Sequence, residues 1–118
     1  MLVVDDNKAL AFVIQQMLEL QGYEVRTAEN GEEGYWVYLL FRPDLVITDI
    51  QMPRRDGLEL TRRIGVHDSG VRVIYMSGDL SRFRTLLDEE EKRYQVGLLQ
   101  KPFSKLDLLR LVSEADFY

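Results

Sequence analysis

Short apolar runs alternate with longer segments of mixed polarity along the whole chain. Four apolar runs have the length and composition of buried strands, 2–4, 45–48, 71–76 and 98–100, and the more polar segment 23–28 is a further strand candidate. The segments that follow them are predicted as helices: 8–20, 31–41, 58–66, 81–94 and 105–115. This alternation predicts an α/β fold in which a parallel sheet is covered by helices on both faces. The order of the strands does not follow from periodicity.

The predicted helix 81–94 has an incomplete apolar stripe. Phe83, Leu86 and Leu87 begin a stripe, but Glu90 and Glu91 stand where it should continue. We expect the acidic run 88–91 to be a solvated face or a frayed helix end, and a partner-selective surface is the alternative. Weak anchoring would make this helix the best candidate for a mobile output element.

The run 35–41 is apolar on every side of its predicted helix. Since a helix that covers a sheet needs only one apolar stripe, we expect some of Trp36, Leu39 and Phe41 to point outward. The run could be a bulky cover over the sheet edge, or a docking or dimer surface.

Composition sets limits on function. The 118 residues suit one compact domain over 1–118, and with 46% hydrophobic and 30% charged residues the chain is typical of soluble globular proteins. A net charge of −5 argues against nucleic-acid binding as the main role. The pairs Arg54-Arg55 and Arg62-Arg63 could form a local basic patch, although a solvated helix face is the plainer interpretation.

Cysteine is absent and histidine occurs once, which excludes several kinds of site. Disulfides, thiol catalysis and thiolate metal sites need cysteine, and His67, expected in a loop after a helix, cannot form a histidine metal cluster by itself. No run resembles a secretory signal or is long enough to span a membrane, so a cytoplasmic setting is expected.

Polar side chains follow each of the four apolar runs. Asp5-Asp6 comes after 2–4, Asp49 after 45–48, Ser77 after 71–76, and Lys101 after 98–100. The carboxyl ends of parallel strands meet at one rim of a sheet, where ligands bind. We therefore expect three carboxylates, a hydroxyl and an ammonium to meet in one shallow pocket.

The chemistry of such a pocket points to a metal ion and to phosphoryl transfer. Crowded carboxylates repel one another unless a cation lies between them, and hard oxygen ligands suit Mg²⁺ or Mn²⁺. With Lys101 and Ser77 beside it, Asp49 could act as a nucleophile that forms an acyl phosphate. Singly, these residues have plainer roles, since Asp5 alone could cap the first helix. Their joint occurrence favours a functional site.

The chain resembles the receiver domains of two-component response regulators. The matching residues lie at 3–7, 49–53 with Asp56-Gly57, 76–78 and 101–103, and the resemblance covers essentially the whole chain. The stretch 98–104 is most similar to receivers attached to hybrid histidine kinases. The resemblance implies a flavodoxin-like (βα)5 fold with a five-stranded parallel sheet in the order 2-1-3-4-5.

The resemblance also implies a metal site. Asp5 and Asp6 would hold Mg²⁺, with Asp6 the more direct ligand. Asp49 and the backbone carbonyl of Gln51 would complete the protein's share of the coordination. The domain would be a signalling switch that catalyses its own phosphorylation and dephosphorylation, not a classical enzyme.

A second set of implied roles concerns the switch. Asp49 would take a phosphoryl group from a phosphohistidine on a sensor histidine kinase or a histidine phosphotransfer protein. Lys101 would pair with the carboxylate and then with a phosphoryl oxygen, and Ser77 would move toward the phosphoryl group. Pro102 is expected to follow a cis peptide bond. Apart from the resemblance, the apolar run 35–41, through Trp36 and Leu39, or the region of the 81–94 helix could serve homodimerisation or docking.

Leu98 departs from the family pattern. Many receivers have an aromatic residue there, which swings inward as the Ser or Thr moves. Leucine offers no polar tip, so we expect signalling to act instead through the loop after Ser77 and the helix that follows it.

Two other functions remain open from the residues. A Mg²⁺-dependent phosphatase or phosphotransferase with an aspartyl nucleophile would need a further carboxylate and a cap, yet Gln51 stands two residues after Asp49 and the chain has no room for a cap domain. A binding module that has lost phosphorylation is disfavoured by the intact polar set.

Overall fold

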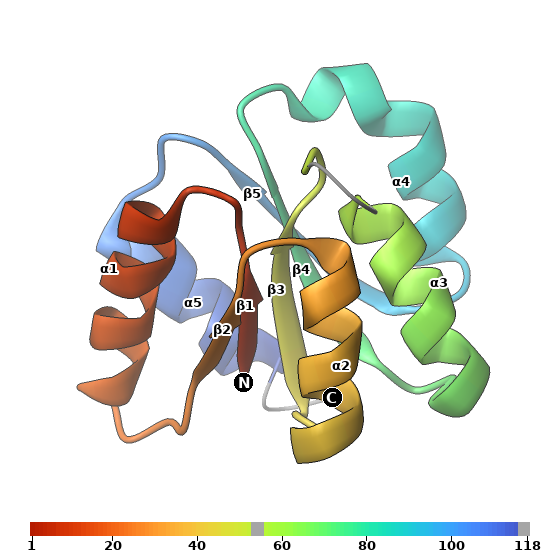
Figure 1. Ribbon diagram of the computed structural model, residues 1–118. Coiled ribbons are helices and arrows are strands. Elements are labelled where there is room, and N and C mark those ends of the chain that lie inside the picture. Colours follow the sequence, from red (N-terminus) through yellow and green to blue (C-terminus); the bar gives the residue numbers. More distant parts are fainter. Residues whose placement is uncertain (53–55, 116–118) are drawn as a thin grey trace.

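The computed structural model describes residues 1–52 and 56–115 and confirms the expected parallel sheet. Its strands are β1 (Leu2–Val4), β2 (Arg26–Ala28), β3 (Leu45–Asp49), β4 (Arg72–Ser77) and β5 (Gln95–Gln100). Neighbouring strands are all parallel, in the order β2-β1-β3-β4-β5 (Figure 1). Their carboxyl ends therefore lie along one edge of the sheet.

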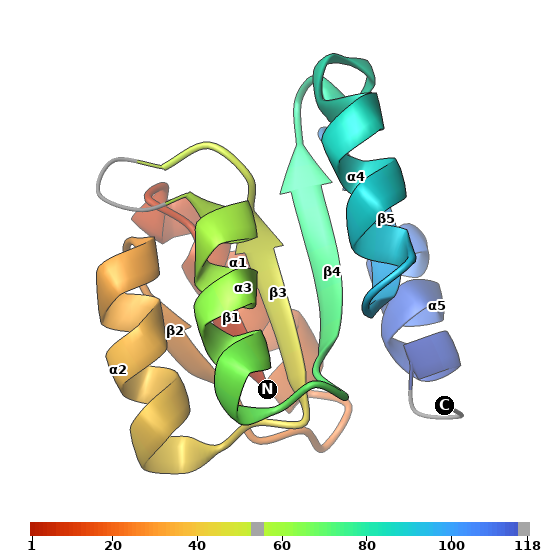
Figure 2. The same ribbon diagram turned by 90° about the vertical axis from the view of Figure 1, so that its right-hand side faces the viewer.

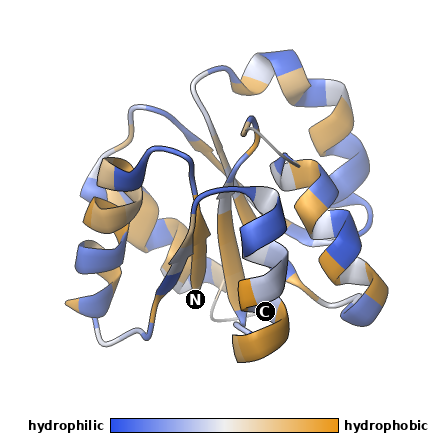
Figure 3. Cartoon of the chain, in the orientation of Figure 1, coloured by the Kyte–Doolittle hydropathy of each residue, from blue (hydrophilic) through white to orange (hydrophobic). Residues whose placement is uncertain are grey.

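Helices cover both faces of this sheet. They are α1 (Lys8–Glu19), α2 (Gly31–Phe41), α3 (Gly57–His67), α4 (Arg84–Glu91) and α5 (Lys105–Ala115), with a short 3-10 helix η1 at Leu80–Phe83. α1 and α5 lie on one face, and α2, α3 and α4 on the other (Figures 1 and 2). Successive strand residues enter opposite cores, so both faces of the strands are apolar. Figure 3 shows apolar strands inside and polar loops at the carboxyl edge.

Asn and Asp side chains begin the helical segments that follow β1 to β4. The capping residues, each accepting a hydrogen bond from a backbone N–H three residues on, are Asn7, Asn30, Asp56 and Asp79. Since Asn7 caps α1, Asp5 is not used as the cap and is available to the pocket. The caps hold the loops of the carboxyl edge in place.

The bounds of several elements differ from the sequence prediction. The strand predicted at 23–28 is limited to Arg26–Ala28, because its sole sheet neighbour, β1, offers three residues for pairing. The strand predicted at 98–100 instead spans Gln95–Gln100, since the whole of β5 pairs with β4 although several of its residues are polar or small. The predicted helix 81–94 is divided into η1 and the shorter α4.

Glu90 overturns the expectation of a wholly solvated acidic run. It is 1% exposed, and neither carboxylate oxygen has a hydrogen-bond partner among the described residues. Its described ion pair is with Arg62 on α3, whose Nε lies 3.5 Å from Oε1. Glu90 stands one turn after the buried Leu87, so the helix turns it inward on the same face. Asp88 and its other acidic neighbours are exposed, as expected.

The apolar run on α2 is divided between core and surface. Tyr35 and Tyr38 are buried, while Trp36 and Phe41 are exposed, as expected. Leu39 is half-buried and packs against the core, and the neighbouring Leu40 is exposed. The prediction that some of Trp36, Leu39 and Phe41 point outward is thus confirmed by Trp36 and Phe41. A docking or dimer role for α2 stays a prediction.

Some smaller predictions also change. His67 is the last residue of α3 and not part of a loop, and its Nε2 lies 2.6 Å from the Tyr35 hydroxyl. The Arg63 guanidinium lies over the ring of Tyr35, so part of the Arg62-Arg63 pair packs against the protein. Pro53 and Arg54-Arg55 lie outside the described residues. None of the described helices is long and apolar enough to cross a membrane.

Candidate functional site

Three carboxylates converge at the carboxyl edge of the sheet. Asp5 and Asp6 follow β1, and Asp49 ends the adjacent β3, so strand pairing brings them together. One oxygen from each lies within 4.8 Å of the others. Asp5 is buried, Asp49 is half-buried and Asp6 is exposed. The expected convergence is thus confirmed, and the cluster opens toward solvent on the Asp6 side.

Lys101 reaches the same cluster from the end of β5. Its Nζ lies 2.9 Å from Asp5 Oδ2, to which it donates a hydrogen bond, and 3.3 Å from Asp49 Oδ2. Its backbone N–H donates to the Ser77 carbonyl at 2.8 Å. The bond between Lys101 and Pro102 is cis, as the resemblance to receiver domains implied. The ammonium therefore bridges two of the three carboxylates.

Burial and charge act against each other in this pocket. Burial raises the pKa of Asp49, the Lys101 ammonium lowers it, and the charge of Asp5 raises it again, leaving it above its usual value. For Lys101, burial lowers the pKa, but the hydrogen bond and charge of Asp5, with the charge of Asp49, outweigh it and raise the pKa. Lys101 thus stays an ammonium, and the cluster has more negative than positive charge.

The backbone around Asp49 is tightly packed. The Thr48 hydroxyl donates to the Asp49 carbonyl at 2.9 Å, and the N–H of Gly57 donates to the Ile50 carbonyl at 2.9 Å. A Cβ on Gly57 would overlap the Asp49 carbonyl. Gly57 was part of the sequence motif, but its close approach to Asp49 was not predicted. It holds the start of α3 against the end of β3.

Ser77 lies at the rim between the strand that holds Asp49 and the strand that leads to Lys101. It is 5% exposed, and its register partner on β5 is Gln100, while Met76 pairs with Asp49 on β3. Its Oγ accepts a hydrogen bond from the Asp79 N–H at 2.9 Å. This contact ties the hydroxyl to its own loop.

Gln100 was given no role from the sequence, yet its side chain has three contacts. Its Nε2 donates to the carbonyls of Gly78 at 2.7 Å and Lys101 at 3.1 Å. Its Oε1 accepts from the Leu80 N–H at 3.3 Å. The available signal was its position directly before Lys101 at the end of a strand.

Two further sequence predictions concern Gln51 and Leu98. Gln51 is exposed two residues after Asp49, and its backbone carbonyl as a metal ligand stays a prediction. Leu98 is half-buried and pairs with the fully buried Tyr75 on β4, so it belongs to the core under α3 and α4. Its part in switching also stays a prediction.

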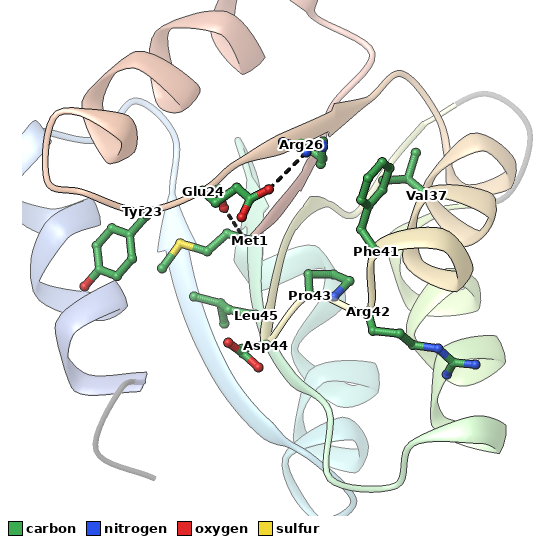
Figure 4. A pocket seen from close by; sticks show the side chains of 10 residues that line it. All are labelled: Met1, Tyr23, Glu24, Arg26, Val37, Phe41, Arg42, Pro43, Asp44 and Leu45. Carbon is green, nitrogen blue, oxygen red and sulfur yellow. Dashed lines mark hydrogen bonds and ion pairs between the residues drawn. The ribbon is translucent and has the colours of Figure 1, made fainter.

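A separate hollow lies at the opposite, amino-terminal edge of the sheet. Its volume is about 270 Å³, and Figure 4 shows side chains that line it. They include Met1, Glu24, Phe41, Asp44 and Leu45. None of the predicted site residues lines this hollow. It therefore plays no part in the carboxylate cluster.

Comparison with known proteins identifies the family. The family model of the response regulator receiver domain matches residues 1–113. The chain belongs to the response regulator receiver family. This receiver is 33% identical over 119 residues to the chemotaxis protein CheY of Halobacterium salinarum, with 96% of the chain and 92% of the relative covered. It is 31% identical over 104 residues to sporulation initiation phosphotransferase F of Bacillus subtilis, with 86% and 81% covered.

Solved structures agree with this placement. The receiver domain of NtrX from Brucella abortus superposes with a TM-score of 0.83 at 25% identity, covering 97% of this chain and 95% of that one. The CheX–CheY–BeF3–Mg²⁺ complex from Borrelia burgdorferi contains a chain similar at a TM-score of 0.84 and 29% identity, with 96% and 85% covered. The receiver is therefore a two-component signalling switch whose carboxylate cluster could bind a metal ion.

Proposed function

We propose that this receiver, a single domain over residues 1–118, takes a phosphoryl group on Asp49. The donor is a phosphohistidine on a sensor histidine kinase or a histidine phosphotransfer protein. The observation that carries this proposal is the placement of the Lys101 ammonium between Asp5 and Asp49, beside a cluster of three carboxylates. The exposed side of the cluster leaves Asp49 open to a donor.

A divalent cation fits the donor set. The cluster offers hard carboxylate oxygens within 4.8 Å of one another and holds more negative charge than Lys101 balances. Asp5, Asp6, Asp49 and the backbone carbonyl of Gln51 would hold Mg²⁺, or Mn²⁺. When bound, the ion supplies positive charge to the oxygens of the phosphoryl group.

The reaction at Asp49 is a nucleophilic substitution at phosphorus. A carboxylate oxygen of Asp49 forms a bond to phosphorus while the bond from phosphorus to the histidine nitrogen breaks, and the electron pair stays on the imidazole. Lys101 remains protonated and donates to a phosphoryl oxygen, which lowers the cost of the negative charge there. Asp5 orients Lys101 through its 2.9 Å hydrogen bond.

Loss of the phosphoryl group uses the same groups. Water attacks phosphorus and the bond between phosphorus and the Asp49 oxygen breaks, with its electron pair staying on the carboxylate. The Asp49 carboxylate is regenerated, and inorganic phosphate, which keeps both protons of the water, is released. Asp79 stands near the site in sequence, but its Oδ1 accepts from the Ser81 hydroxyl and the Arg82 N–H. The Asp79 carboxylate therefore caps the start of η1.

Incubation with acetyl phosphate and Mg²⁺, followed by intact mass measurement, tests the proposal. We expect the wild type to gain one phosphoryl group and Asp49→Asn to gain none. Asp44→Asn is the matched control, because Asp44 is exposed just before the same strand and should leave the gain unchanged. Turnover of an external phosphate ester without a stable adduct would favour a phosphatase instead, and no reaction at all would favour a binding module.

A further inference from the structure

The carboxamide of Gln100 connects two loops of the site. Its nitrogen faces two carbonyl oxygens, those of Gly78 and Lys101, and its oxygen faces the N–H of Leu80. Each atom of the amide therefore meets a partner of the opposite kind. Although Gln100 is exposed, its side chain joins the β4–η1 loop to the backbone carbonyl of Lys101.

The strand order determines which way Ser77 would move relative to Gln100. β4 lies between β3, which ends in Asp49, and β5, which ends in Gln100. Ser77 is paired with Gln100, so a movement of Ser77 toward a phosphoryl group on Asp49 is a movement away from Gln100. Because Gly78 follows Ser77 directly, its carbonyl would leave the amide in the same movement.

We propose that Gln100 is a positioning residue whose carboxamide holds the Ser77–Leu80 loop in the unphosphorylated position. This inference rests on the proposed function, because it assigns the contact that phosphorylation must break. When Ser77 turns toward the phosphoryl group, the hydrogen bonds of Gln100 with Gly78 and Leu80 break. The Ser77–Leu80 loop, and with it the start of η1 that leads into α4, is then free to move. The bonds thereby set how readily the receiver enters its active state.

The neighbouring residues support this assignment. Leu98, the position where many receivers have an aromatic residue, has no polar atom in its side chain and is half-buried in the core. The loop itself is tied by the Asp79 N–H to Ser77 Oγ, a bond that keeps the hydroxyl within the loop. Gln100 is thus a polar link from β5 to the Ser77 loop.

Two substitutions separate the contacts of the amide. Gln100→Met keeps the length of the side chain and removes the donor and acceptor groups. Gln100→Glu keeps an acceptor for the Leu80 N–H but places negative charge against the Gly78 and Lys101 carbonyls. Gln95→Met is the matched control, because Gln95 is exposed at the other end of the same strand.

Amide hydrogen exchange of the unphosphorylated protein is the first measurement. We expect exchange at Leu80 to become about three- to tenfold faster in Gln100→Met, the effect of losing a modest hydrogen bond, and to stay unchanged in Gln95→Met. Gln100→Glu should also speed exchange in the loop. Unchanged exchange at Leu80 in Gln100→Met, or wild-type exchange in Gln100→Glu, would overturn the proposal.

The second measurement is the affinity for beryllofluoride, a phosphoryl mimic, in the presence of Mg²⁺. Removal of bonds that favour the unphosphorylated loop should tighten binding about fivefold in Gln100→Met. The affinity for Mg²⁺ alone should not change. A variant whose fold was damaged would bind the mimic more weakly, so unchanged or weaker binding counts against the proposed role of Gln100. If the wild type itself bound no beryllofluoride, the proposed function would fail, while the exchange measurement would still decide the role of Gln100.

Discussion

Gly57 lies so close to the Asp49 carbonyl that a methyl group has no space there. Gly57→Ala should lower the free energy of unfolding by about 1–3 kcal/mol, since the added carbon forces the start of α3 away from β3. On helix propensity alone, alanine should be better than glycine by about 1 kcal/mol, so the sign of the effect is diagnostic. Urea unfolding of both proteins provides the measurement.

Gly70→Ala is the control for this substitution. A Cβ on Gly70 would meet only the Asp68 carboxylate at 3.5 Å, an ordinary contact. Its effect should stay within about 0.5 kcal/mol. A stabilising Gly57→Ala would show that the start of α3 can move without cost.

Some residues of the site could be predicted from the sequence, and others could not. Asp5, Asp49 and Lys101 each follow an apolar run, so the topology of a parallel sheet was enough to bring them together. The roles of Gly57 and Gln100 depend on distances between loops that only packing sets. A sequence pattern contains no such distances, and neither residue has a chemistry that stands out by itself.

The buried carboxylate of α4 gives this helix a dependence on pH. Burial raises the pKa of Glu90 above its ordinary value of 4.5, and the charges of Arg62 and Arg93 only partly offset the rise. A raised folded-state pKa means that the protonated form favours folding. The stability that the protonated Glu90 contributes is fully present below pH 4.5, and it is lost as the pH rises through the pKa of Glu90 in the folded state.

Glu90→Gln should therefore stabilise the receiver at neutral pH, by on the order of 1 kcal/mol, because a neutral amide avoids the cost of burying a charge. The gain should shrink as the pH falls toward 4.5. Urea unfolding at several pH values measures it, with the exposed Glu91→Gln as the control. A loss of stability at neutral pH would instead mean that the ion pair with Arg62 outweighs the burial cost.

The sequence predicted the strands and helices with small differences in their bounds, but the prediction that the acidic run of α4 is solvated was wrong for Glu90. The spacing did put Glu90 on the same face as Leu87, and the expectation that charge would turn that face to solvent was reasonable. Arg62 stands on α3, which packs beside α4 only in the folded chain, so the partner that makes burial tolerable was not visible from the α4 segment.

Across the whole molecule, a metal ion should add stability by mass action. If the carboxylate cluster holds Mg²⁺ only in the folded chain, Mg²⁺ at about 100 times its Kd should add ~2.7 kcal/mol to the free energy of unfolding. Thermal unfolding with and without Mg²⁺, then after chelation, measures this. Asp6→Asn should reduce the gain, whereas Asp44→Asn should keep it. Equal gains in both variants would place the ion elsewhere.

The order of the strands in the sheet could not be predicted from the residues alone. Periodicity predicted five strands and five helices, but a strand order follows from pairing between distant segments, which no local pattern encodes. The order 2-1-3-4-5 came from the resemblance to receiver domains, and the sheet confirms it.

The ion pair between Lys101 and Asp5 joins residues 96 positions apart. During synthesis, all three carboxylates of the cluster emerge before the Lys101 ammonium, which lies between two of them. A chain folded only through β4 would hold these carboxylates together without that charge, and its pocket would repel an incoming phosphate. Pairing of β5 with β4 therefore completes the charge pattern of the cluster as well as the sheet. If Asp49 is phosphorylated as proposed, the reaction would need β5 and Lys101 in place as well as the strands that hold the carboxylates.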